Sequence, residues 1–65
     1  MIKVNGEAVN GMDGVTVSEL LSGRGYKTVF IAVELNGAVV KKDEYADCVL
    51  KDGDTVEIVN FVGGG

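Results

Sequence analysis

The sequence predicts an α+β domain in which a mixed sheet of about five strands packs on one short helix. Valine, isoleucine and threonine are β-branched, make up 18 of the 65 residues, and favour strands. Asn-Gly, the strongest short hairpin signal, stands between predicted strands at residues 5–6 and at residues 36–37. A single segment combines a helix-capping pattern with apolar residues at helical spacing. The length leaves room for one domain.

Five segments are expected to be strands. Asn5-Gly6 joins the first two strands and Asn36-Gly37 joins the third and fourth, each as a hairpin turn. The third segment is a near-continuous apolar run, which indicates a mostly buried strand. Residues 51–54 have turn chemistry and precede the last strand, and one helical turn is expected around Tyr45 within polar residues 41–47. The predicted strands span residues 2–5, 7–10, 29–35, 38–40 and 55–60.

The predicted helix begins after Thr16, which forms a capping box with Glu19 three residues later. Apolar residues then recur at i, i+3 and i+4, and so share one face of the helix: Val17, Leu20 and Leu21. Glycines at positions 23 and 25 end the helix within about two turns. Such a short helix is unstable alone, so we expect it to pack on the sheet.

The order strand, strand, helix, strand, strand, strand predicts how the sheet is connected. A right-handed crossover through the helix places the first and last strands side by side and parallel at the centre of the sheet. This arrangement is the β-grasp, the ubiquitin-like architecture. We expect a β-grasp domain over residues 1–60, followed by a flexible C-terminal tail over residues 61–65 that ends in three glycines.

Charge and composition exclude several classes of function. Ten acidic residues against six basic ones give a net charge of −4, which opposes binding to nucleic acid or to an anionic membrane surface. No apolar run approaches the length of about 20 residues that is needed to span a bilayer, and no signal peptide is visible. With no histidine and one cysteine, metal sites and histidine acid–base chemistry are not expected. We therefore expect a cytoplasmic carrier or binding module that is not an enzyme and binds no cofactor itself.

The final segment of the chain resembles a known family. Residues 52–65, together with Ile2-x-Val4-Asn5-Gly6 and Val33-x-Leu35-Asn36-Gly37, are similar to the ThiS family, the sulfur carriers of thiazole formation for thiamin. The resemblance covers the whole chain without insertion. In that family the tail ends in Gly-Gly, and here one more glycine precedes the pair. MoaD-type carriers of molybdopterin synthesis share the fold but are usually longer, which favours ThiS.

The resemblance implies that Gly65 is adenylated with ATP by a ThiF-like adenylyltransferase and then converted to a thiocarboxylate. A cysteine desulfurase would supply the sulfur, and thiazole synthase, ThiG, would accept it. Activation is needed because a terminal carboxylate, with a pKa of about 3.3–3.7, is ionised at neutral pH and is a poor electrophile. Gly63 and Gly64 have no side chains and can therefore thread a narrow channel in a partner.

The last strand also predicts where partners dock. Alternation places Val56 and Ile58, with Ile2 and Val4, on the face that the helix covers. Val59 and Phe61 then lie on the open face, next to Val62 and the tail. An exposed apolar surface beside a reactive terminus suits a partner interface. The alternative is that Phe61 folds back into the core.

Several other assignments stay open at the level of sequence. The chain could be a MoaD-type or tRNA-thiolation sulfur carrier, a protein modifier joined to its targets through Gly65, or a binding module with an inert tail. Cys48, beside Val49 and Leu50, is expected to be a small core residue, with a persulfide as the alternative. The acidic residues within 43–57 are either solvated surface or attract a basic partner face.

Overall fold

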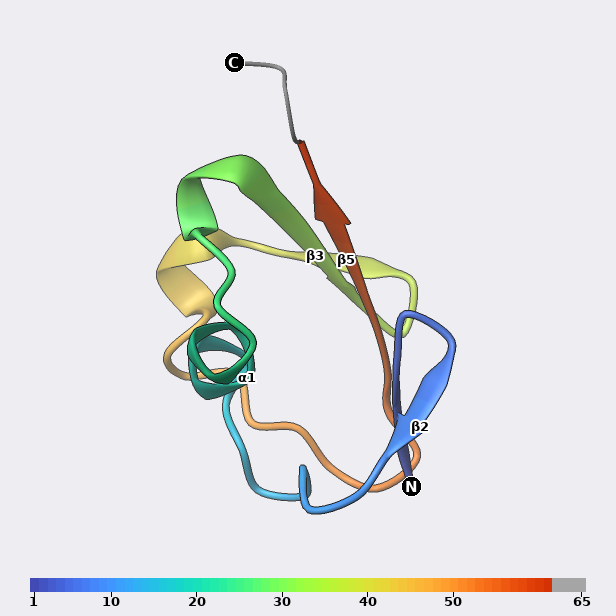
Figure 1. The fold of residues 1–65 in the computed structure, drawn as a ribbon. Helices are drawn as coiled ribbons and strands as arrows, with labels where there is room; N and C mark the ends of the chain where they lie inside the picture. Colours follow the sequence, from blue (N-terminus) through green and yellow to red (C-terminus); the bar gives the residue numbers. More distant parts are fainter. Residues whose placement is uncertain (62–65) are drawn as a thin grey trace.

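The computed structural model describes residues 1–61 and shows a five-stranded sheet that curves around one helix (Figure 1). The strand order across the sheet is β2-β1-β5-β3-β4, which confirms the β-grasp prediction. Two short 3-10 helices, η1 and η2, flank the β3–β4 hairpin. The elements in chain order are β1 (Ile2–Val4), β2 (Glu7–Val9), α1 (Val17–Gly23), η1 (Thr28–Phe30), β3 (Ile31–Leu35), β4 (Ala38–Val40), η2 (Lys42–Glu44) and β5 (Thr55–Asn60).

Both predicted Asn-Gly turns close hairpins. Asn5 and Gly6 have φ values of 50° and 82° between β1 and β2. Asn36 and Gly37 have φ values of 52° and 86° between β3 and β4. Positive φ at both central residues defines a type I′ turn, whose twist matches that of the flanking strands.

The predicted parallel pairing of the first and last strands is confirmed. β1 pairs with β5 in parallel, with Lys3 opposite Thr55, and β5 pairs on its other side with β3, antiparallel. Where β1 ends, the Asn5 side chain continues the contact, because its Oδ1 accepts a hydrogen bond from the Ile58 N–H at 2.7 Å. β5 is therefore the central strand, bonded along both edges.

The helix α1 is defined at both ends by hydrogen bonds that the sequence encodes. Thr16 and Glu19 form the predicted capping box, each side chain accepting the backbone N–H of the other. At the C-terminal end, the N–H groups of Gly25 and Tyr26 donate to the carbonyls of Ser22 and Leu21. These two hydrogen bonds together form the Schellman motif, which requires the left-handed conformation that Gly25 adopts at φ 77°.

The core lies between α1 and the inner face of the sheet. Val56 is fully buried and Ile58 is 7% exposed, so the predicted covered face of β5 is correct. Tyr45 and Leu50, from the segment between η2 and β5, close the core on the side of the helix. The buried residues are Ile2, Val4, Val17, Leu20, Leu21, Ile31, Val33, Val40, Tyr45, Leu50, Val56 and Ile58.

The predicted strand over residues 29–35 is wrong at its first two residues. Val29 and Phe30 belong to η1 and are 67% and 48% exposed, and the strand begins only at Ile31. The Phe30 N–H donates to the Lys27 carbonyl at 3.1 Å, which curls the chain away from the sheet. An apolar run shows that burial is favoured but not where a strand begins, because a turn and a strand can both carry apolar side chains. The first two strands also end one residue earlier than predicted, before Asn5 and Asn10.

A buried carboxylate joins the second hairpin turn to the start of β5. Asp54 is 4% exposed and accepts hydrogen bonds from the Asn36 side-chain amide at 3.0 Å and from the Lys51 N–H at 2.9 Å. The side-chain Oδ1 of Asn36 in turn accepts the Thr55 N–H at 2.9 Å. Burial alone would raise the pKa of Asp54, but the hydrogen bonds from Asn36 and Lys51, with the Lys51 charge, lower it below 3.8.

We expect two glycine substitutions at the end of α1 to act in opposite directions. Gly25→Ala forces a Cβ into a left-handed conformation and should destabilise the fold by about 1 kcal/mol. Gly23→Ala has open space and a helical backbone, and should stabilise the fold by about 0.5–1 kcal/mol. Urea unfolding of the two variants measures both effects. Equal shifts in one direction would contradict this account of the helix end.

Asp54→Asn should destabilise the domain at neutral pH by about 1–3 kcal/mol, because the buried hydrogen bonds to the carboxylate are lost or reversed. Since the pKa of Asp54 is lowered on folding, the carboxylate's contribution is complete above the unfolded value of 3.8. It is lost as the pH falls through the folded value. The difference in unfolding free energy between the variant and the wild type should therefore shrink in acid. Urea unfolding across the acidic range tests this, with the exposed Asp43→Asn as control; a difference independent of pH would refute it.

Candidate functional site

The candidate site is the end of the molecule where the chain leaves β5. Asn60 pairs with Ile31, and the N–H of Phe61 donates to the carbonyl of Phe30 at 2.6 Å. This bond attaches the chain just beyond β5 to η1. The predicted site residues Val62, Gly63, Gly64 and Gly65 lie outside the described residues, so the tail and its roles stay predictions.

The predicted open face of β5 is exposed at both apolar positions. Val59 is 49% exposed and Phe61 is 54% exposed, so Phe61 does not fold back into the core. Val59 stands opposite Ala32 of β3 on the face of the sheet that turns away from α1. A phenylalanine and a valine left exposed together are typical of a surface that a partner covers.

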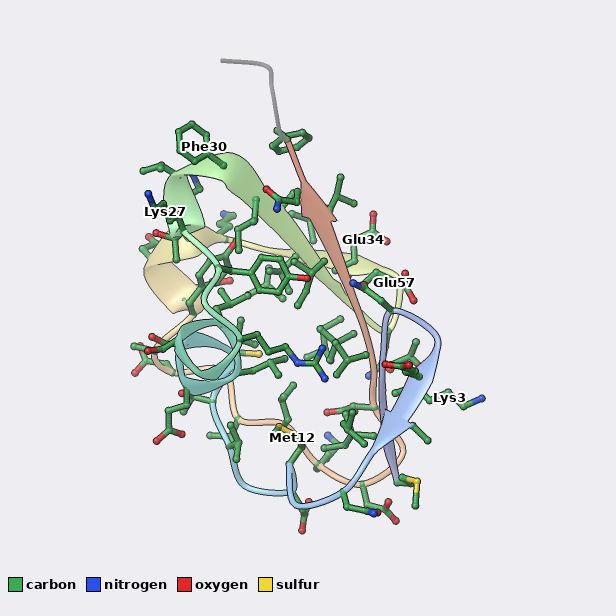
Figure 2. All side chains as sticks on the ribbon, in the orientation of Figure 1. Lys3, Met12, Lys27, Phe30, Glu34 and Glu57 are labelled. Carbon is green, nitrogen blue, oxygen red and sulfur yellow. The ribbon has the colours of Figure 1, made fainter. Side chains whose placement is uncertain are left out.

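Two further apolar residues at this end were not among the predicted site residues. Val29 and Phe30 in η1 are exposed, and Phe30 projects from the end of the molecule where β5 terminates (Figure 2). We name Val29, Phe30, Val59 and Phe61 the tail-root patch. Periodicity gave no signal for Val29, because it is in phase with the inward-facing Ile31 and Val33 of the same apolar run.

Cys48 packs against the core and is partly buried, in agreement with the packing role predicted for it. Its carbonyl accepts the Val17 N–H at 2.9 Å, which ties the segment before β5 to the start of α1. Cys48 also borders an open groove of about 480 Å³. The groove is lined by Leu35, Ala38, Val39, Val40, Glu44, Asp47 and Cys48.

Within residues 1–61, no three or more His, Cys, Asp or Glu side chains are grouped so that they could hold a metal ion. None of the helices in this part of the chain combines the length and apolarity needed to cross a membrane. What the geometry offers is an apolar patch beside the point where the C-terminal segment begins.

Fold and site together define a small ubiquitin-like domain with exposed apolar side chains at the end of its central strand. The ThiS family model matches residues 2–65. The chain therefore belongs to the ThiS family.

Individual relatives agree with this assignment. The chain is 36% identical to the sulfur carrier protein ThiS of Bacillus subtilis, and the match covers all of both chains. It is also 44% identical to a thiazole synthase of Magnetococcus marinus over 98% of this chain. The chain spans about a fifth of the length of the thiazole synthases that it matches. The crystal structure of a ThiS thiamine biosynthesis protein from Geobacter metallireducens has a TM-score of 0.78 and 39% identity, covering 98% of this chain and 97% of that one.

Proposed function

We propose that this chain is the sulfur carrier of thiazole formation in thiamin biosynthesis. The observation that carries the proposal is the match over full length to a sulfur carrier protein ThiS, on a fold of the same kind. The exposed tail-root patch supports it, because a carrier must dock on the enzymes that load and unload it. The carrier itself is not a catalyst, and its partners supply the catalytic groups.

In this proposal the carboxylate of Gly65 is the reacting group. One carboxylate oxygen attacks the α-phosphorus of ATP and pyrophosphate leaves, which gives an acyl adenylate. A sulfur nucleophile then attacks the acyl carbon and displaces AMP. Hydrosulfide gives the thiocarboxylate directly, whereas a persulfide gives an acyl disulfide, whose S–S bond is cleaved by a second thiol to release the thiocarboxylate and leave a disulfide. The chain binds no cofactor of its own, and ATP is held by the activating enzyme. Gly63 and Gly64 pass through the channel of that enzyme because they lack side chains.

Membership of the ThiS family implies three partners. A ThiF-like adenylyltransferase activates Gly65, a cysteine desulfurase supplies the sulfur, and a thiazole synthase, ThiG, accepts it. Support for the last partner comes from the thiazole synthases of Magnetococcus marinus and Paramagnetospirillum magneticum, which include a stretch 44% identical to this chain. Val59, Phe61 and Val62 dock on the partners, and Phe30, whose carbonyl accepts the Phe61 N–H, is exposed at the same end of the domain.

The mass of the protein tests the sulfur-carrier function directly. After incubation with the adenylyltransferase, ATP and a sulfide source, the intact mass should rise by about 16 Da, the difference between sulfur and oxygen. A variant lacking Gly64 and Gly65 should show no gain and no ATP–pyrophosphate exchange. Conjugates of high mass would instead identify a protein modifier. Retained exchange in the shortened variant would rule out Gly65 as the reacting residue.

Phe61→Ala tests the docking surface. Because the ring is 54% exposed, its removal should change the melting temperature little, while the affinity for the adenylyltransferase or for the thiazole synthase falls by at least about tenfold, near 1.4 kcal/mol. The matched control is Val49→Ala, which removes a 57% exposed apolar side chain outside the tail-root patch. Titration calorimetry measures both affinities. Unfolding of Phe61→Ala, or unchanged affinity for both partners, would show that Phe61 is not a docking residue.

A further inference from the structure

Two glutamates face each other at the middle of the open face of the sheet. Glu34 of β3 is directly opposite Glu57 of β5 in the antiparallel register, and both are exposed. Directly opposed residues have Cβ atoms about 4.5–5.5 Å apart, so two like charges at these positions disfavour the folded state. Figure 2 shows both glutamates on neighbouring strands at the same level of the sheet.

No cation within the described residues neutralises this pair. The salt bridge found in residues 1–61 joins the N-terminal amine to Asp52, far along the sheet from both glutamates. Lys3 shares the open face through its pairing with Thr55, but its side chain extends outward past β2, away from Glu34 and Glu57 (Figure 2). The free domain therefore holds two exposed carboxylates together without a compensating charge in this part of the chain.

The carboxylate pair is continuous with the apolar docking surface. Along β5, Val59 follows Glu57 by two residues on the same face, about 7 Å further on. On the other side of the pair, Val39 of β4 is opposite Glu34 and is 69% exposed. The two charges are thus bordered by apolar side chains on both sides. A partner that covers Val59 and Phe61 would remove water from the carboxylates as well, and uncompensated burial of charge is costly.

We propose that the Glu34–Glu57 pair receives a cationic side chain, best an arginine, from the enzyme that docks on the tail-root patch. A guanidinium carries five N–H donors and forms paired, charge-assisted hydrogen bonds with carboxylates, so one arginine can contact both glutamates. This inference rests on the proposed function in naming the partner as the adenylyltransferase. The pair selects a partner with a basic centre in its docking face, and rejects enzymes whose docking face is apolar or acidic there.

The two roles considered for the pair predict different effects of neutralising the glutamates on partner affinity. If the glutamates only keep the sheet face soluble, neutralising them leaves partner affinity unchanged. If they receive a cation, neutralising them relieves repulsion in the free domain but weakens the complex. Stability and affinity should then move in opposite directions, which a loss of folding cannot imitate.

The test uses the full chain with both glutamates replaced, Glu34→Gln and Glu57→Gln, and the purified adenylyltransferase as the probe. A matched control, Glu7→Gln with Asp43→Asn, also removes two negative charges, but at exposed positions on β2 and η2. Titration calorimetry without ATP gives the dissociation constant at low and high salt, and thermal unfolding gives stability. Thiocarboxylate formation is followed separately by mass.

For the double glutamine variant we expect a melting temperature equal to or above that of the wild type. Its dissociation constant at low salt should rise about tenfold or more, and its affinity should depend less on salt. The control should bind like the wild type. If the affinity of the double variant is within about twofold of that of the control, the inference is overturned. In that case the proposed function still stands as long as the wild type gains sulfur. Conversely, weaker binding by the variant with no sulfur gain by the wild type would support the inference and refute the proposed function. A wild type that does not bind the enzyme would overturn both.

Discussion

The parallel pairing of β1 with β5 is the contact on which the rest of this fold depends. It joins residues about fifty positions apart, as in the bond from the Ile58 N–H to the side chain of Asn5, and it places β5 between β1 and β3. Without that central strand the two hairpins would be separate two-stranded ribbons, which are only marginally stable in water. The seven-residue α1 would also lose the surface on which it packs, and a helix of that length is unstable alone. The same strand carries the chain to the tail-root patch, so one pairing determines both the core and the position of the site.

Where local chemistry determines the structure, the sequence was a reliable guide. Asn5-Gly6 and Asn36-Gly37 predicted hairpin turns, and both turns are type I′, because few other residue pairs tolerate positive φ at both positions. Thr16 and Glu19 predicted the start of α1 because their side chains satisfy each other's backbone N–H. These signals depend on neighbouring residues alone. The start of β3 was mispredicted because it depends on a turn, Lys27 to Phe30, whose hydrogen bond has no distinctive residue.

The candidate site was predictable in part for the same reason. Alternation along β5 correctly separated the buried Val56 from the exposed Val59, because period two within a strand is a local property. The contribution of Phe30 was missed, since its position beside Phe61 arises from a backbone hydrogen bond between two residues that are 31 positions apart. The opposition of Glu34 and Glu57 was missed as well, because register between strands depends on how two distant segments align. Residues of a strand can be assigned to faces from sequence, but their neighbours across the sheet cannot.

Because β1 and β5 are parallel, Met1 lies beside the start of β5 and Phe61 lies beyond its far end (Figure 1). From Thr55 to Phe61 an extended chain covers about 20 Å, most of the way along the sheet. A linker, label or additional domain attached ahead of Met1 would therefore leave the domain at the pole opposite the tail-root patch. The domain is suited to being tethered by its amino end, on a sensor surface or within a longer polypeptide, while the tail-root patch stays accessible.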